Sequence, residues 1–169
     1  MIRIGQAVDI HPFCTGRPLI LGGIEIPFEK GLQGHSDADV LLHAIAESIL
    51  GALALGDLGA HFPDTDPKYR GADSKKLLAE VVQMMKNKGY SVGNIDATVL
   101  TERPKLRDYI DTMSYNTSMI LECGMDQVSI KATRGEKLGF IGREEGICAV
   151  CVCLLVRDPE TVPAVCRTI

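Results

Sequence analysis

The amino-acid sequence predicts a single α+β domain over residues 1–169, in which helices cover one face of a mixed sheet of the four-stranded type and a small hairpin is added. Three observations predict this class. The length of 169 residues suits one domain with a sizeable core. The chain contains no internal repeat, linker or low-complexity tract. Strand-like and helix-like apolar patterns also mix without strict βαβ repetition, which favours a mixed sheet.

Strands are expected where apolar residues alternate or form short runs between turn residues. Residues 2–9 alternate and run into Asp9 and His11. Residues 19–26 are expected to form the hairpin, which turns at Gly22 and Gly23. Further strands are expected at residues 94–101, 128–133 and 146–157.

Three helices are expected from their apolar faces and capping residues. Ser36 is expected to cap the first helix, and Asp39, at the third position, completes a capping-box-like start. The expected helices run from Ser36 to about Leu53, from Asp73 or Ser74 to Gly89, and from about Lys105 to Glu122 with a stop at Gly124. Residues 57–72 and 134–145 are expected to be long loops.

The composition excludes several classes of protein. The chain has 18 Lys and Arg against 22 Asp and Glu, a formal net charge of −4, and no Lys/Arg run, so nucleic acid and anionic membrane are poor partners. The longest nearly apolar run, residues 40–55, contains His43, Glu47 and Ser48 and is too short and polar to span a bilayer. The first residues have no apolar signal-peptide core. We therefore expect a cytoplasmic protein, or the mature part of one from a plastid-type organelle.

The cysteines are expected to be small buried hydrophobes. Cys148 and Cys151 have the spacing of half a zinc site, but no second Cys/His pair accompanies them and they lie in an expected buried strand. The same interpretation covers all six, which are Cys14, Cys123, Cys148, Cys151, Cys153 and Cys166.

A metal site is predicted from three residues in two segments. Asp9 and His11 are two positions apart on an expected strand, so their side chains point to the same face. His43, inside an apolar helix, is on its own better explained as a core histidine bonded to a carbonyl. Together they make three ligands with an open fourth position, as in catalytic zinc sites. Asp37 or Asp39 could orient a ligating histidine, or could simply favour the helix N-terminus.

Three other segments suggest contacts to a substrate. His35 and Ser36 lie at the expected helix start, whose free amides suit a phosphate; the alternative is a cap beside an exposed histidine. The acidic turns at residues 57–59 and 62–67 either hold substrate hydroxyls or are only polar turns. Residues 131–143 offer cations and hydroxyls for phosphates, and Glu136 as an oxygen ligand for a Mg²⁺-like ion, or they form a solvated charged loop. The Gly-Lys-Ser/Thr ending of a Walker loop is absent.

Ordered motifs along nearly the whole chain carry a family resemblance. They are Asp9-x-His11, Gly34-His-Ser-Asp-Ala-Asp39, His43, Ala54-Leu-Gly-Asp57-x-Gly59, Phe62-Pro-Asp-Thr-Asp-Pro67, Gly71-Ala-Asp-Ser74, Pro104-Lys105 and Glu136-Lys-Leu-Gly-Phe140. In these blocks the chain resembles the 2-C-methyl-D-erythritol 2,4-cyclodiphosphate synthase family of the non-mevalonate isoprenoid pathway. The resemblance implies a metal-dependent phosphorus–oxygen lyase that cyclises 4-diphosphocytidyl-2-C-methyl-D-erythritol 2-phosphate and releases CMP.

The resemblance also implies roles for individual residues. Asp9, His11 and His43 match ligands of Zn²⁺ or a similar ion, and Glu136 matches a ligand of a second ion, Mg²⁺ or Mn²⁺, on the substrate diphosphate. His35 and Arg134 match the pair that stabilises the transition state. Substrate contacts are implied for Asp9, His11, His35, Ser36, Asp57, Leu58, Gly59, Phe62, Pro63, Asp64, Thr65, Asp66, Thr101, Glu102, Arg103, Pro104, Lys105, Leu106, Arg107, Thr133, Arg134, Gly135, Glu136, Phe140 and Arg143.

The family forms a homotrimer with sites between subunits, and a trimer-forming fold is therefore expected. Some members hold an isoprenoid diphosphate in a central cavity, and Phe140 and Arg143 match positions tied to the substrate or to that cavity. This chain departs from the family pattern where Thr133-Arg134-Gly135-Glu136 replaces Thr-Thr-Thr-Glu, at Gly5-Gln6-Ala7, and at Thr101-Glu102-Arg103. Arg134 either stabilises the same charge as the usual threonine or points elsewhere.

Two alternatives keep the metal but change the function. In one, metal-bound water hydrolyses a nucleotide diphosphate, and the product is a linear phosphate. In the other, the protein is a zinc-stabilised oligomer that binds an isoprenoid or a nucleotide. That alternative requires a fourth protein ligand to close the metal site, for which Cys14 and His61 are the candidates.

Overall fold

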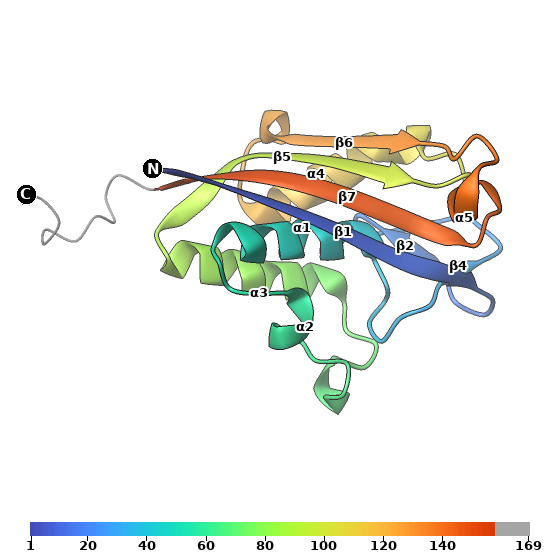
Figure 1. Ribbon diagram of the computed structural model, residues 1–169, viewed down its shortest axis with the longest axis horizontal. Coiled ribbons are helices and arrows are strands. Elements are labelled where there is room, and N and C mark those ends of the chain that lie inside the picture. Colours follow the sequence, from blue (N-terminus) through green and yellow to red (C-terminus); the bar gives the residue numbers. More distant parts are fainter. Residues whose placement is uncertain (158–169) are drawn as a thin grey trace, which may run out of the picture.

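A computed structural model gives the structure of residues 1–157 (Figure 1). Its main sheet has the order β4-β1-β7-β5-β6. Strands β5 and β6 are parallel and the other pairs are antiparallel, so the predicted mixed sheet is confirmed. The strands are β1 (Ile2–Cys14), β4 (Gly31–Leu32), β5 (Tyr90–Leu100), β6 (Val128–Thr133) and β7 (Gly146–Arg157).

The predicted hairpin is present as a separate sheet of β2 (Leu19–Leu21) and β3 (Ile24–Ile26). Gly22 and Gly23 form its turn with φ values of 58° and 73°. Positive φ at both central positions is the conformation that a tight hairpin turn requires and that glycine adopts without steric cost. The glycine pair therefore accounts for the position of this turn.

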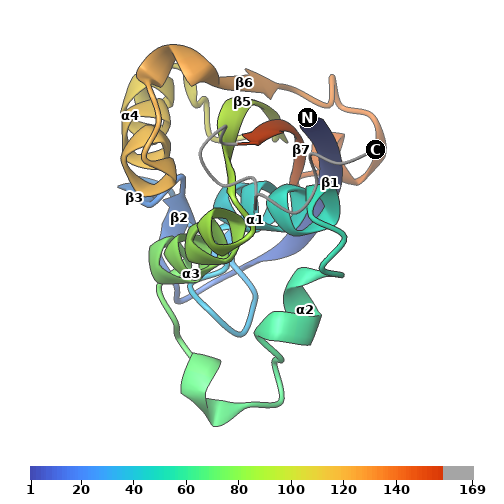
Figure 2. The ribbon, with the colours of Figure 1, turned by 90° about the vertical axis from the view of Figure 1, so that its left-hand side faces the viewer.

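Three long helices lie on the same side of the main sheet (Figure 2). Helix α1 packs on β1 and β7, α4 packs on β6, and α3 packs against α1. Because α1 lies between the sheet and α3, all its residues except Glu47 and Gly51 are buried. The helical elements are α1 (Val40–Ala52), α2 (Leu58–His61), η1 (Pro67–Tyr69), α3 (Ser74–Asn87), η2 (Arg107–Tyr109), α4 (Ile110–Leu121), η3 (Met125–Gln127) and α5 (Gly139–Gly142).

Gly5 allows α1 to approach β1 closely. A Cβ atom at position 5 would collide with the carbonyl oxygen of Ser48 and lie 2.7 Å from the amide nitrogen of Ala52. Such a distance is too short for any real side chain, so only glycine permits this helix–strand contact. The close approach brings the helix that carries His43 against the strand that carries Asp9 and His11.

Several predicted boundaries are wrong for identifiable reasons. Strand β1 continues to Cys14, so Asp9 and His11 lie inside the strand rather than at its end. The sheet has a fifth strand because the two-residue β4 pairs with Phe13 and Cys14. The third helix begins at Ile110, since the preceding chain forms the short η2 turn around the buried Leu106. The expected loops contain α2, η1 and α5.

The start of the first helix also differs from the prediction. Ser36 does not cap it; Asp39 does, and its carboxylate accepts a hydrogen bond from the amide of Leu42. Asp39 is fully buried and also accepts from the amides of Gly22 and Gly23, which ties α1 to the hairpin. One amide of this N-terminus is thus occupied by the protein's own carboxylate, and a phosphate contact at the preceding His35 and Ser36 stays a prediction.

No helix covers the other face of the sheet within residues 1–157. That face exposes a group of large apolar side chains, with exposed fractions between 42% and 66%, namely Ile2, Ile4, Val8, Ile10 and Val152. Among the described residues, no helix is both long and apolar enough to cross a membrane.

Candidate metal centre and substrate pockets

Asp9, His11 and His43 meet between β1 and α1, as the sequence predicts. Asp9 and His11 point to the helix side of β1, and His43 follows the first turn of α1. One carboxylate oxygen of Asp9, Oδ2, lies 3.1 Å from Nε2 of His11 and 3.1 Å from Nδ1 of His43. The two ring nitrogens are 3.3 Å apart. Three atoms that can each donate a lone pair therefore form a small triangle.

The size of this triangle fits a tetrahedral metal. With metal–ligand distances of about 2.0–2.1 Å, two ligands of a tetrahedral zinc ion are separated by about 3.3 Å. The observed separations of 3.1, 3.1 and 3.3 Å match that spacing. The three residues form a group with metal-binding geometry among the described residues. Neither Cys14 nor His61 belongs to it, and His61 instead bonds the carbonyl of Leu55 through Nε2 at 2.9 Å.

The protonation of His11 also fits a ligand. Its Nδ1 lies 2.7 Å from the carbonyl oxygen of Gln33, which can only accept a hydrogen bond. Assigned from this contact, Nδ1 carries a proton, and Nε2, on the side of Asp9, is the nitrogen left to bind a metal. The remaining nitrogen of His43, Nε2, faces the hydroxyls of Ser36 and Ser74. In each histidine the nitrogen that faces away from Asp9 makes a hydrogen bond, which orients the ring, as is usual for metal-binding histidines.

The mutual contacts shift the pKa of two ligands. Burial alone would raise the pKa of Asp9, but hydrogen bonds and charge interactions with His11 and His43 lower it well below its usual range. Burial lowers the pKa of His11, but the contact with Asp9 outweighs this effect and raises it. The carboxylate is therefore ionised at neutral pH, which is the state that binds a cation.

The three residues Asp9, His11 and His43 are called the metal triad below. A groove beside them contains part of the predicted substrate site. Two adjoining cavities of about 300 and 480 Å³ share His11, His43, Leu58, Phe62 and Asp64 in their walls. His35 is exposed and lines the smaller cavity with Ser36, whereas Gly59 and Pro63 line the larger.

Three predicted residues of the acidic turns either cap a helix or are exposed. Asp57 caps α2 through the amide of Ala60, and Asp66 caps η1 through the amide of Lys68. Thr65 is exposed. The capping carboxylates hold the shape of this loop, and their contact with a substrate stays a prediction.

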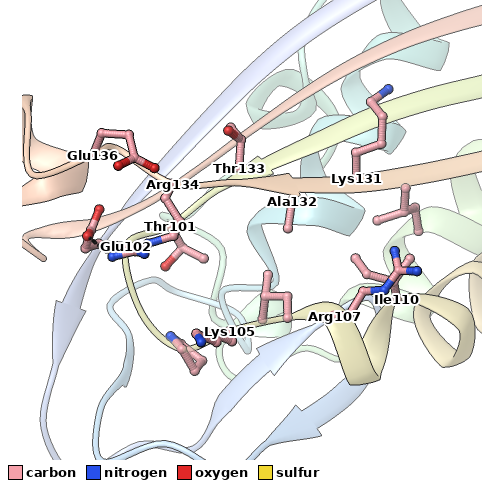
Figure 3. Close-up of a pocket in the computed structure, with 13 residues that line it drawn as sticks. Thr101, Glu102, Lys105, Arg107, Ile110, Lys131, Ala132, Thr133, Arg134 and Glu136 are labelled. Carbon is pink, nitrogen blue, oxygen red and sulfur yellow. Dashed lines mark hydrogen bonds and ion pairs between the residues drawn. The ribbon is translucent and has the colours of Figure 1, made fainter.

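A second pocket of about 560 Å³ lies at the ends of β5 and β6 (Figure 3). Most of the residues expected to contact cytidine and phosphate line it, together with Lys131 and Ala132 of the predicted phosphate segment and the unpredicted Ile110 and Ile130. The predicted ones are Thr101, Glu102, Pro104, Lys105, Leu106, Arg107, Thr133, Arg134 and Glu136. Arg103 turns away and pairs with Glu29 and Glu144 at 3.3 and 3.7 Å.

Arg134 points to Glu102 inside this pocket. Its Nη2 lies 2.5 Å from Oε1 of Glu102, and the amide of Lys137 lies 3.4 Å from the other carboxylate oxygen. The hydrogen bond from Arg134 lowers the pKa of Glu102. Phe140 and Arg143 lie apart from this pair on the α5 segment, where Arg143 pairs with Glu145 at 2.6 Å; their predicted roles stay predictions.

The metal triad and the second pocket are separated within one chain. The strand register aligns Asp9 with Ala149, Ala149 with Val99, and Val99 with Ala132. From Asp9 to Ala132, this row of aligned residues crosses three spacings between neighbouring strands, a distance of about 14 Å. Ala149 and Val99 are fully buried, so packed core fills the space between the two sites. The predicted site residues thus form two groups.

The cysteine prediction is confirmed in β7. Cys148, Cys151 and Cys153 are free and buried. Burial raises the pKa of the Cys151 thiol to about 12, which keeps it protonated at neutral pH. Cys14 and Cys123 are only partly buried, and Cys166 lies outside the described residues.

The fold and the site together define a mixed α/β protein with a candidate Asp/His/His metal centre. The chain belongs to the YgbB family, whose model matches residues 2–156. It is 55% identical over 155 residues to 2-C-methyl-D-erythritol 2,4-cyclodiphosphate synthase of Bacillus cytotoxicus, which covers 92% of this chain and 98% of the relative. The synthase of the same name from Geobacter metallireducens is 56% identical over 156 residues, 92% of this chain and 99% of the relative.

Solved structures share the fold. The bifunctional IspDF from Campylobacter jejuni matches with a TM-score of 0.90 and 40% identity over 93% of this chain and 42% of that chain, so this protein spans less than half of the bifunctional one. IspF of Plasmodium falciparum in complex with CDP matches with a TM-score of 0.82 and 34% identity, over 93% of this chain and 97% of that chain.

Proposed function

We propose that this protein converts 4-diphosphocytidyl-2-C-methyl-D-erythritol 2-phosphate to 2-C-methyl-D-erythritol 2,4-cyclodiphosphate and CMP. Relatives that carry the synthase name are 55–56% identical over more than nine-tenths of this chain. The observation that carries the proposal is the open triangle of Asp9, His11 and His43 beside a groove. A solved relative bound to CDP supports a cytidine nucleotide as part of the substrate.

The chemistry needs positioning and charge rather than a nucleophile from the protein. An oxygen of the substrate's 2-phosphate attacks the β-phosphorus, and the bond from that phosphorus to the oxygen of the departing CMP breaks. Both partners are anionic, so bound cations stabilise the reaction by reducing their repulsion and by aligning them. This accounts for an enzyme of the phosphorus–oxygen lyase class without a Ser/His/Asp or Cys/His nucleophile.

Two ions fit the residues present. Asp9, His11 and His43 are proposed to hold Zn²⁺ or a similar ion with one position open to the substrate. Glu136, in the wall of the second pocket, is proposed as a ligand of Mg²⁺ or Mn²⁺, because a carboxylate oxygen suits these hard cations. His35 on the groove and Arg134 in the second pocket are proposed to stabilise the charge that develops on the phosphates.

The complete site is proposed to form between copies of the chain in a homotrimer. One substrate must contact both the metal triad and the second pocket, yet packed core separates them within a chain. The exposed apolar face of the sheet, which includes Ile4 and Val8, supports self-association. The two relatives that are 55–56% identical are bacterial, and the cytoplasm is the proposed compartment.

Product analysis tests this function. The purified protein with Zn²⁺ and Mg²⁺ is expected to release CMP and a cyclic diphosphate, identified by ³¹P NMR. His43→Ala is expected to abolish the reaction, whereas His61→Ala, which changes a histidine outside the triad, is expected to retain it. A linear phosphate product would establish the hydrolase alternative instead. Full activity of the metal-free protein would contradict the proposal.

A further inference from the structure

The proposed metal ligand His43 is connected to a chain of buried and partly buried polar groups behind it. Its Nε2 lies 2.8 Å from Oγ of Ser74 and 3.1 Å from Oγ of Ser36. Ser74 is 1% exposed, and His43 and Ser36 are also buried. Ser74 in turn contacts Asp37 through both its hydroxyl and its amide. The histidine, the serine and the aspartate come from α1, the start of α3 and the loop before α1.

The carboxylate fixes the direction of the hydrogen bonds in this chain. The Ser74 hydroxyl donates its proton to Oδ1 of Asp37, because a carboxylate oxygen accepts hydrogen bonds. Oδ2 of Asp37 accepts from the Ser74 amide at 3.0 Å, which holds the two residues in register. The Ser74 oxygen therefore presents a lone pair to His43, and Nε2 of His43 donates to it. Nδ1 is left without a proton and faces Asp9.

We propose that Ser74 and Asp37 are positioning residues that hold His43 in the tautomer with the proton on Nε2, so that Nδ1 binds the metal. This inference rests on the proposed function of Asp9, His11 and His43 as metal ligands. A carboxylate that acts on a metal-bound histidine fixes its ring and increases its basicity. Here the Ser74 hydroxyl transmits the effect of Asp37 to the imidazole.

Neither of the two nearest polar residues can do the same. Oγ of Ser36 accepts from the amide of Ala38 at 3.1 Å, but within residues 1–157 no carboxylate fixes its proton, so that hydroxyl can donate or accept toward His43. Asp39 is committed to the amides of Leu42, Gly22 and Gly23. Of the two aspartates that the sequence suggests for orienting a ligand, the geometry therefore selects Asp37.

Zinc affinity of the metal-free protein, measured by competition with a chromophoric chelator, tests the proposal. Ser74→Ala is expected to weaken zinc binding by about tenfold to a hundredfold, the usual effect of removing an outer partner of a ligand. Asp37→Asn is expected to weaken it in the same direction, and Ser74→Thr, which keeps the hydroxyl, is expected to restore it. The matched controls are Ser48→Ala, a buried serine of α1 that bonds Ile45, and Asp73→Asn, which removes the charge of the residue that caps α3. Both should bind zinc as the unchanged protein does.

A second readout separates the tautomer from a general loss of structure. Long-range ¹H–¹⁵N spectra of the zinc-loaded protein are expected to show a proton on Nε2 of His43, and Ser74→Ala should make that proton exchange rapidly. If Ser74→Ala fails to fold, Asp37→Asn and Ser74→Thr decide the question. Folded Ser74→Ala and Asp37→Asn proteins with unchanged zinc affinity would overturn the proposal. If the metal site itself were wrongly assigned, His43→Ala would bind zinc normally. That result differs from failure of the positioning roles of Ser74 and Asp37.

Discussion

Arg134 and Glu102 form an ion pair in the second pocket, with Nη2 of the guanidinium 2.5 Å from Oε1 of the carboxylate. The side chain of Glu102 is 5% exposed and that of Arg134 is 51% exposed. The amide of Lys137 also contacts the carboxylate, so Glu102 fixes the segment that carries the proposed metal ligand Glu136. Because one guanidinium nitrogen binds Glu102, the rest of the charged group is open to the pocket.

This ion pair predicts how stability depends on pH. The hydrogen bond from Arg134 lowers the pKa of Glu102 in the folded protein, so the folded state binds a proton less readily than the unfolded state does. The stabilisation is therefore fully present above the ordinary glutamate pKa of 4.5 and is lost as the pH falls through the lower folded value. The difference in urea midpoint between the unchanged protein and Glu102→Gln should be constant near neutral pH and shrink below about 4.5.

The control for this titration is Glu25→Gln, at an exposed position on β3. Its urea midpoint should follow that of the unchanged protein at every pH. A Glu102→Gln difference that grew on acidification would contradict the assigned direction of the pKa shift.

Gly5→Ala should destabilise the protein through its effect on α1. The added methyl group collides with the backbone of α1 at Ser48, and the overpacking is expected to lower the free energy of unfolding by about 1–3 kcal/mol. Denaturant unfolding measures the loss. Gly51→Ala is the matched control, since a Cβ atom added there would lie 3.9 Å from the Gln6 carbonyl oxygen, an ordinary van der Waals distance. Equal stability of Gly5→Ala and the unchanged protein would show that α1 does not lie this close to β1.

Val8→Lys should break the proposed trimer without unfolding the chain. Val8 lies on the uncovered face of the sheet, and burying such a side chain contributes about 1.5–3 kcal/mol in each copy. Light scattering after size-exclusion chromatography is expected to show a monomer for Val8→Lys and a trimer for the unchanged protein. Gln83→Lys, on the exposed side of α3, should remain a trimer. An unchanged mass for Val8→Lys would mean that this face is not the contact.

Mixing two inactive variants tests whether one site uses two chains. His43→Ala removes the metal triad but keeps the second pocket, and Glu136→Ala does the reverse. Each alone is expected to be inactive. Co-expressed, they should form mixed trimers in which about one quarter of the interfaces combine two intact halves and recover activity. Activity that stays at the level of the single variants would place the whole site within one chain.

The predictable parts of this structure depend on local patterns. The apolar run that starts at Gly146 and the glycine pair at Gly22 and Gly23 determine β7 and the hairpin turn through neighbouring residues alone. The capping pattern at Ser36 misleads because Asp39 competes as a cap and is held there by the distant hairpin.

The candidate site is also predictable only in part, because local patterns do not show which distant residues contact one another. The strand period places Asp9 and His11 on one face, but no local pattern pairs them with His43. Ser74 bonds His43 from 31 residues away, and Arg134 bonds Glu102 from 32 residues away. Such partners are determined by packing between elements, so the sequence suggests Ser74 as a cap and leaves the direction of Arg134 open.

The most direct test of the account is an anomalous diffraction map at the zinc edge for crystals grown with Zn²⁺ and CDP. The account predicts a zinc peak about 2.0–2.2 Å from Oδ2 of Asp9, Nε2 of His11 and Nδ1 of His43, with a fourth position that no protein side chain occupies. A zinc ion bound elsewhere, or closed in by a fourth protein ligand, would contradict it.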